Sequence, residues 1–374
     1  MLHKLAAIIL VTASIALASP VHAQAFCQGT GCGAIPFSQD SLNSLFFQFQ
    51  YQYTNQLFSD IARAGTLANI SSAPTGSVNL QKFTVGASGS AGFVPLQNKT
   101  LTMPGVGVFQ DVPSGGAYAI PHIFGGVNLG YLVGNEYDPY DSNGSTPSML
   151  SLSRVDVYAT GAEYREHYSR DNHNLKVVAG FYNRGFDVRY HLVEGANIAG
   201  GPLFRFLGVS LGTGYHLSRL NIQAEQYQKY RVASLSGVQV FWDGYNYLSI
   251  QTKIKTYPVE IMSGMQLLYV LSLSVGGGVT TNSGYADMNL TRIGPVYPST
   301  DILNNLLSSA GVNLISNTFT SYLTMNISGR GTIPKHVPYA KVSMDINLGP
   351  AKIFAEGIST RRAYGANAGV RVQF

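Results

Sequence analysis

The sequence predicts an all-β fold, an antiparallel transmembrane β-barrel of about twelve strands, with a range of roughly ten to fourteen. Segments that alternate apolar and polar residues recur after residue 121. Only 11% of the residues are charged, whereas Gly (41) and Tyr (23) are abundant, which suits a wall whose outer face contacts lipid. Beyond the N-terminal region there is no uninterrupted apolar run of about 18 residues, so strands and not helices are expected to cross the membrane. A secreted soluble β-protein is the alternative.

Residues 1–23 have the pattern of a secretory signal peptide. His3 and Lys4 give a basic start, an apolar run follows from Leu5 to Ala18, and Val21-His22-Ala23 forms a small-residue cleavage site. The run is shorter than the roughly 20 residues that a membrane-spanning helix needs. We therefore expect export and cleavage before Gln24.

The two cysteines, Cys27 and Cys32, are expected to form a disulfide. An exported pair of cysteines five positions apart is typical of a small oxidised loop, and no neighbouring His supports a zinc site. Lipid attachment at Cys27 is the alternative, but Phe26 stands where a small residue is needed.

The segment 24–121 is expected to form an N-terminal plug or accessory segment. Residues 40–63 carry apolar side chains at helical spacing, with Asp40 available as N-cap and Gly65 beyond the end. Their middle, 47–53, alternates and fits a strand equally well, so both readings stay open. Residues 65–120 are rich in Gly, Ser, Thr and Pro and show weak periodicity.

The barrel is expected to occupy residues 122–374. Its strands share a two-residue period, and in order they are 123–133, 150–166, 175–181, 186–192, 203–217, 220–232, 245–256, 265–275, 319–328, 339–348, 351–359 and 364–374. Asn183-Arg184-Gly185 predicts a hairpin turn, and Ser218-Arg219 predicts another. Residues 300–310, between Pro298 and Gly311, predict one short amphipathic helix.

The last strand carries the most specific signal in the chain. One face holds Tyr364, Ala366, Ala368, Val370, Val372 and Phe374, and the other is small or polar. A strand that ends the chain on an aromatic residue resembles the closing strand of bacterial outer-membrane β-barrels. The resemblance implies an outer-membrane location, contact with its lipids, and recognition of Tyr364, Val370, Val372 and Phe374 by the barrel-assembly machinery. The general layout also resembles the surface-adhesin barrels of spirochaetes.

Short motifs do not support catalysis or metal binding. Gly208-Val209-Ser210-Leu211-Gly212 matches a nucleophile elbow, but that motif needs a strand-to-helix turn, and these residues fall within a strand. The run Asp138 to Leu150 fails at both ends as a calcium loop. Hence no metal, cofactor or enzyme activity is expected.

Charged residues share the inward parity of several expected strands. The candidates for the lumen lining are Arg154, Asp156, Asp187, Arg189, Glu225, Lys229, Arg231, Lys253, Lys255, Lys341, Asp345 and Arg371. They either pair and fill the interior or line a path whose excess of Arg and Lys favours anions.

By analogy with the fold, the expected function is passage or transport of a small solute through a partly occluded lumen. The alternative is a surface-exposed adhesin or ligand-binding barrel with a closed lumen, in which the segments 135–147 and 282–300 form the binding loops. An outer-membrane hydrolase ranks third. The net charge of +5 is spread out, so nucleic acid is not expected as a partner.

Overall fold

The computed structural model describes residues 24–29, 32, 38–71, 80, 82–103, 107–135, 147–170, 175–198, 203–235, 238–298 and 321–374. These residues form one antiparallel sheet of thirteen strands and one long N-terminal helix. None of the described helices has the length and apolarity needed to span a membrane. The expected helix at 300–310 and the signal peptide at 1–23 lie outside the described residues.

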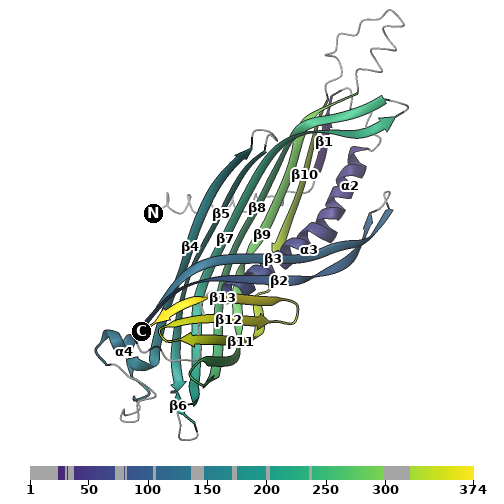
Figure 1. Ribbon diagram of the computed structural model, residues 1–374. Coiled ribbons are helices and arrows are strands. Elements are labelled where there is room, and N and C mark those ends of the chain that lie inside the picture. Colours follow the sequence, from purple (N-terminus) through teal and green to yellow (C-terminus); the bar gives the residue numbers. More distant parts are fainter. Residues whose placement is uncertain are drawn as a thin grey trace, which may run out of the picture.

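Ten strands close into a ring (Figure 1). In ring order they are β2 (Phe83–Met103), β3 (Gly107–Asn128), β4 (Val155–Arg170), β5 (Leu175–Val193), β7 (Phe204–Leu235), β8 (Val238–Leu267), β9 (Leu271–Pro298), β11 (His336–Leu348), β12 (Ala351–Ser359) and β13 (Tyr364–Gln373). The ring closes where β13 pairs with β2, so the first and last strands of the ring leave no open edge at that joint. The all-β barrel is confirmed, at the lower end of the expected strand number.

The remaining elements lie outside the ring or between its strands. They are the strands β1 (Gln24–Gln28), β6 (Ala196–Asn197) and β10 (Ser321–Thr332), and the short helices α4 (Leu129–Leu132) and η3 (Leu152–Arg154). β10 pairs with the far half of β9, beyond the part that pairs with β11, and β1 pairs with β10.

An apolar band encircles the ring. Its outer face exposes residues of alternate positions, such as Val275, Val342 and Val370, each more than half exposed. Two aromatic pairs bound the band: Phe83 stacks on Phe374 at one end of the β2–β13 pair, and Phe93 stacks on Tyr364 at the other. Ten residue steps separate Tyr364 from Phe374, which at about 3.3 Å per residue and a tilt of about 40° span about 25 Å, the height of a transmembrane band.

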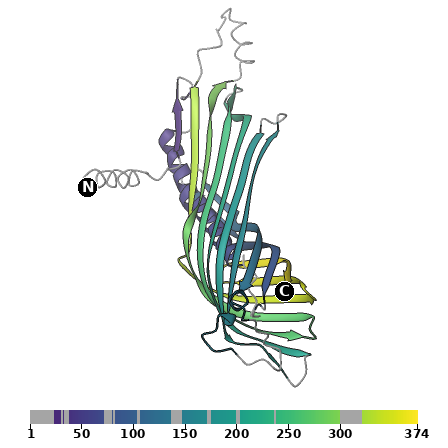
Figure 2. The ribbon, with the colours of Figure 1, turned by 90° about the vertical axis from the view of Figure 1, so that its left-hand side faces the viewer.

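Three strands are far longer than the band requires. β7, β8 and β9 contain 32, 30 and 28 residues, whereas a transmembrane strand needs roughly 9–11. Their extra length, with β10, β1 and the far ends of β4 and β5, forms a second half of the molecule, which we call the tall half (Figure 2).

The outer and inner faces exchange polarity at the boundary between the band and the tall half. Within the band, the outward row across β4, β5, β7 and β8 is Val155, Tyr190, Leu211 and Ile261; in the tall half it is Glu163, Tyr182, Arg219 and Lys253. The inward row changes in the opposite sense, from Asp156, Arg189, Gly212 and Glu260 to Tyr164, Phe181, Leu220 and Thr252. The tall half therefore has the polarity of a water-soluble sheet, polar outside and largely apolar inside.

The N-terminal segment is a helix, which decides between the two readings of residues 40–63. It comprises α2 (Gln39–Phe49), a π-helical turn, η2 (Gln50–Thr54), and α3 (Asn55–Ile70). Its N-cap is Ser38, two residues before the expected Asp40, and the Ser38 side chain accepts a hydrogen bond from the Ser41 amide. The helix runs obliquely across the inner face of the sheet, from β1 to β11–β13 (Figures 1 and 2).

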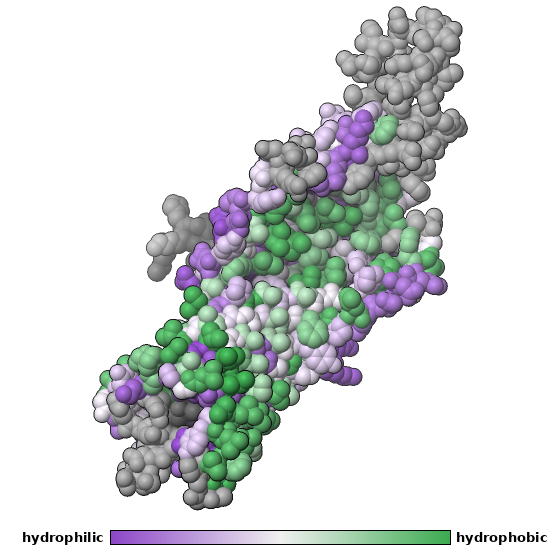
Figure 3. Space-filling model, viewed as in Figure 1, coloured by the Kyte–Doolittle hydropathy of each residue, from purple (hydrophilic) through white to green (hydrophobic). Residues whose placement is uncertain are grey.

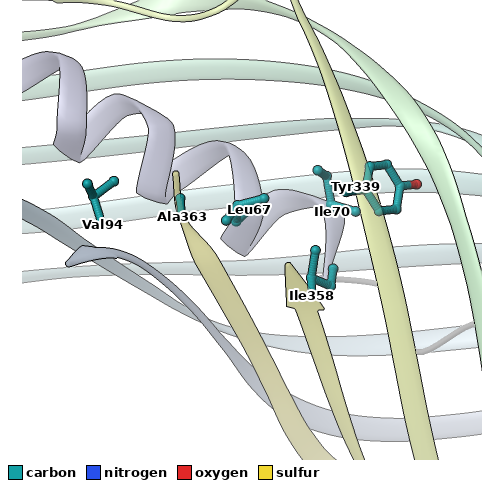
Figure 4. Close-up of a cluster of buried hydrophobic side chains, with 6 residues drawn as sticks. All are labelled: Leu67, Ile70, Val94, Tyr339, Ile358 and Ala363. Carbon is teal, nitrogen blue, oxygen red and sulfur yellow. The ribbon is translucent and has the colours of Figure 1, made fainter. Parts of the chain in front are cut away.

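The helix is held between the tall half and the arm formed by β2 and β3. The backbones approach closely at Gly92, where a Cβ would lie 1.9 Å from the Ala64 carbonyl oxygen. Near the helix C-terminus, Leu67 and Ile70 pack in a buried cluster with Val94, Tyr339, Ile358 and Ala363 (Figure 4). These contacts, and not intrinsic helix propensity, account for the choice of helix.

Several expected boundaries are wrong. β5 runs unbroken through Asn183-Arg184-Gly185, and β7 runs unbroken through Ser218-Arg219, because both sites are paired on each side. The wall begins at Phe83 and not near residue 122, since β2 and β3 are ring strands. The expected loop 282–300 is strand β9 up to Pro298, while most of 135–147 lies outside the described residues.

Candidate functional site

A charged network fills the lumen inside the band. Its centre is Glu260 on β8, which is buried and forms ion pairs with Arg189 from β5 and with Lys341 from β11, the latter at 3.5 Å. The Tyr339 hydroxyl donates a hydrogen bond to the same carboxylate at 3.1 Å. Lys341 also lies 3.1 Å from Glu356 on β12, so the chain of charges crosses the lumen from β5 to β12.

Further pairs occupy the lumen around this centre. Arg371 on β13 pairs with Asp345 at 2.6 Å, and Arg154 pairs with Glu194 at 3.7 Å. Two histidines contact acids: His191 lies 2.8 Å from Asp156, and His216 lies 2.9 Å from Asp187. These side chains are all buried, so they are paired fillings of the interior and do not line an aqueous path.

The end of helix α3 forms the roof of this network. The Asn69 side-chain amide donates to Thr256 at 3.2 Å and to the Ile254 carbonyl at 3.3 Å. The Asn367 side chain donates to the Ser71 carbonyl at 2.6 Å. From the opposite wall, the Tyr118 hydroxyl lies 3.0 Å from that of Thr252 on β8. The helix thus closes the lumen at the level where the band ends.

The structure divides eleven of the twelve lumen candidates into two groups. Seven are buried inside the band: Arg154, Asp156, Asp187, Arg189, Lys341, Asp345 and Arg371. Four do not face the lumen: Glu225, Lys229, Lys253 and Lys255 are on the outer face of the tall half. The assignment of these four is wrong because the strand polarity inverts above the band. The Arg231 side chain lies outside the described residues.

Several lumen residues were missed from the sequence. Glu260 and Glu356 supply the acids that balance the cations, and His191 and His216 contact the two aspartates. A signal for Glu260 was present, since its neighbours Val259 and Ile261 are apolar and face outward, about half exposed.

The nucleophile-elbow match is located where the sequence predicted, within a strand. Ser210 is fully buried in β7 and its hydroxyl accepts a hydrogen bond from Arg189 at 2.8 Å. No group of three or more metal-ligating side chains is assembled among the residues that the structure describes.

The tall half contains an open concave surface, which we call the cup. Its floor is the inner face of β4, β5 and β7 beyond Gly161, where the paired rows are Tyr164–Phe181–Leu220, Glu166–Ala179–Ile222 and Tyr168–Val177–Ala224. Tyr164 and Tyr168 are 51% and 50% exposed, although they point inward. Figure 3 shows hydrophobic surface gathered in the hollow between the long strands and the crossing β2–β3 arm. A contiguous apolar surface of this kind on a folded protein is typical of a binding site.

The outside of the tall half is charged and aromatic. At its lower rim, Arg184 and Arg219 both stack on Tyr182, at 4.8 and 5.8 Å from the ring centre. On β9, burial raises the pKa of the Asp287 carboxyl, and the Arg330 guanidinium 3.6 Å away opposes the shift. This outer face is suited to water and not to lipid.

The Lsa36-like family model matches residues 20–374, almost the whole chain. A search of curated proteins finds no match.

Among solved structures, the outer membrane protease OmpT from Escherichia coli shares 12% identity, with 80% of this chain and 99% of that chain covered and a TM-score of 0.33. The translocator domain of the autotransporter NalP from Neisseria meningitidis shares 8% identity, with coverages of 81% and 90% and a TM-score of 0.24. A FadL homologue from Pseudomonas aeruginosa shares 9%, with coverages of 86% and 98% and a TM-score of 0.25. At these TM-scores the three likenesses carry no argument about activity.

Proposed function

We propose that this chain, which belongs to the Lsa36-like family, is a ligand-binding protein of the cell surface with a closed lumen and a binding surface in the cup. The protein is a β-barrel of the bacterial outer membrane. The observation that carries the proposal is the contrast between the two halves: the lumen within the band is filled by ion pairs and roofed by α3, whereas the cup leaves apolar floor exposed.

Turn lengths support an orientation with the cup outside the cell. The C-terminal strand and two tight turns share one end of the ring: the Gln373 amide donates to the Pro350 carbonyl at 2.8 Å, and the Asn347 amide to the Val270 carbonyl at 2.6 Å. In bacterial barrels the short turns face the periplasm. The tall half, at the opposite end, would then project from the cell surface.

Passage of a small solute is the second candidate function. It requires a route through the network around Glu260, where Arg189, Lys341 and Glu356 are all held in ion pairs. Opening the route would separate buried pairs, which costs several kcal/mol for each charge left alone. The filled lumen therefore favours surface binding over transport.

Planar-bilayer recording tests the closed lumen. The purified protein is expected to insert without discrete conductance steps. Regular steps carried by small ions would overturn the closed-lumen half of the proposal and favour transport.

An energy-transfer measurement tests binding in the cup. The probe is 1-anilinonaphthalene-8-sulfonate, added to the protein in lipid nanodiscs, and the donor is a tryptophan replacing Phe181 on the floor, with the native tryptophan removed as Trp242→Phe. The matched control is Tyr182→Trp, the next residue along β5, which lies on the outer face. We expect stronger transfer from Phe181→Trp. Equal transfer from both positions would contradict a binding surface in the cup.

A further inference from the structure

The cup has a lateral opening. β3 and β4 share six residue pairs, from Asn128↔Asp156 to Ile123↔Gly161, and then diverge. Beyond this point β4 pairs only with β5 and β3 only with β2, among the residues that the structure describes. We call the gap between these two strand edges the seam. Figure 1 shows β3 turning away from β4 as the two strands rise from their shared end.

The seam begins below the top of the apolar band. On β3 the outward positions beyond the last pair are Pro121, Ala119 and Ala117, all apolar and exposed. Ala117 pairs with Phe93, which belongs to the upper aromatic pair of the band. On β4 the outer face becomes charged at Glu163, two residues after Gly161. The lower part of the seam therefore joins the cup directly to the lipid-facing surface.

The floor beside the seam suits hydrocarbon. Tyr164 on β4 stacks with Phe181 on β5, their ring centres 6.0 Å apart, and Leu220 continues the row on β7. On the far side, Tyr118, Ile61 and Leu220 pack around the buried cluster that anchors α3. The row of Tyr164, Phe181 and Leu220 is thus apolar from the seam to the helix, and the next row up carries Glu166, whose carboxylate accepts a hydrogen bond from the Tyr164 hydroxyl.

We infer that the cup takes an acyl chain of a membrane lipid, which enters sideways through the seam while the headgroup stays at the band rim. This inference rests on the proposed function and specifies its ligand class. Lipid suits the cup because the outward positions of β3 along the seam, Pro121, Ala119 and Ala117, continue the membrane-facing band without a polar residue. Where the seam rises above the band, water and headgroups at the rim can bond the edges of β3 and β4, which bare hydrocarbon would leave unsatisfied.

Quenching by brominated lipid tests this inference. Each variant carries one tryptophan, with the single native one removed as Trp242→Phe. In nanodiscs whose lipid chains carry bromine, Phe181→Trp is expected to lose emission to the same degree as Phe186→Trp, a position on the outer band that is 48% exposed. Tyr182→Trp, on the outside of the tall half, is expected to keep its emission. Where Trp242→Phe lowers the yield, Trp242 is retained in all three variants as a constant background.

The outcomes separate this inference from the proposed function. Unquenched Phe181→Trp, or equal quenching of Phe181→Trp and Tyr182→Trp, would overturn the lipid inference. If Phe181→Trp still transfers energy to the water-borne probe, the proposed binding surface stands without lipid as its ligand.

Discussion

At the scale of single residues, the alternation along a strand shows which side chains share a face. Whether that polar face points into the lumen or outward depends on whether lipid or water surrounds the strand at that height. Lys253 and Lys341 both alternate with apolar neighbours in the sequence, yet Lys341 is buried in the lumen and Lys253 lies on the outer face. The difference comes from height: Lys341 is within the band, whereas Lys253 is above it.

Glu260 should be the most sensitive lumen residue. Glu260→Gln leaves the buried Arg189 and Lys341 without one of their anionic partners, and removing one member of a buried pair costs about 3–5 kcal/mol. Urea unfolding in lipid vesicles measures the loss. Lys253→Gln, on the outer face, is the control and should change the free energy of unfolding by about 0.5 kcal/mol or less. Equal effects would show that the lumen network does not stabilise the barrel.

The depth of a residue in the band should set the cost of a charge. Val275 is 62% exposed near the middle of the band on β9, whereas Leu271 lies beside the turn at its lower edge. Val275→Arg should cost roughly 2–4 kcal/mol and Leu271→Arg roughly 0–1 kcal/mol. The same unfolding assay compares them, and the reverse order would disprove the placement of the band.

At the scale of elements, alternation located most of the wall strands but misjudged where several of them end. The expected strand 265–275, for example, contains the turn between β8, which ends at Leu267, and β9, which begins at Leu271. Asn183-Arg184-Gly185 and Ser218-Arg219 looked like turns because polar residues replace apolar ones on the outer face there. In the structure these sites mark the band rim, and the strands continue through it. β2 was missed because its outer face includes the small residues Ala87, Gly89 and Ala91, which give little contrast in hydropathy.

The lumen network could be predicted only in part. Inward parity pointed to Arg154, Asp187 and Arg371, and the structure buries all three, because the strands within the band keep one alternation of faces. Pairing between distant strands, such as Arg189 with Glu260, depends on the ring register, which the sequence does not contain. The expected disulfide between Cys27 and Cys32 is confirmed. It could be predicted from the sequence because the two cysteines are only five positions apart.

The closing strand should be needed for assembly. The Phe374 ring stacks on Phe83, and its amide donates to the Phe83 carbonyl at 2.9 Å, so the last residue also joins the two ends of the ring. Deleting Phe374 should leave unassembled, protease-sensitive protein, whereas Phe374→Tyr should preserve the stack and assemble. Heat-modifiable migration on gels distinguishes the two states. Normal migration of the deletion variant would refute the role of this residue as an assembly signal.

At the scale of the whole molecule, the outer face of one continuous sheet contacts lipid in the ring and water in the tall half. The ten-stranded ring has an apolar outside and a charged inside, as a membrane requires, while the tall half reverses both faces and uses the N-terminal helix as its core. The helix belongs to both halves, because α3 packs in the tall half and ends as the roof of the lumen. The fold therefore joins a ring filled by ion pairs to an exposed concave surface, for which we propose ligand binding.

Labelling of intact cells tests this arrangement most directly. Lys253→Cys places a thiol on the outside of the tall half, and Val270→Cys places one, 51% exposed, at the tight-turn end of the ring. The native cysteines are joined to each other and do not compete. A membrane-impermeant maleimide should label Lys253→Cys in intact cells and Val270→Cys only after the outer membrane is opened. Labelling of Val270→Cys in intact cells, with Lys253→Cys protected, would contradict the account.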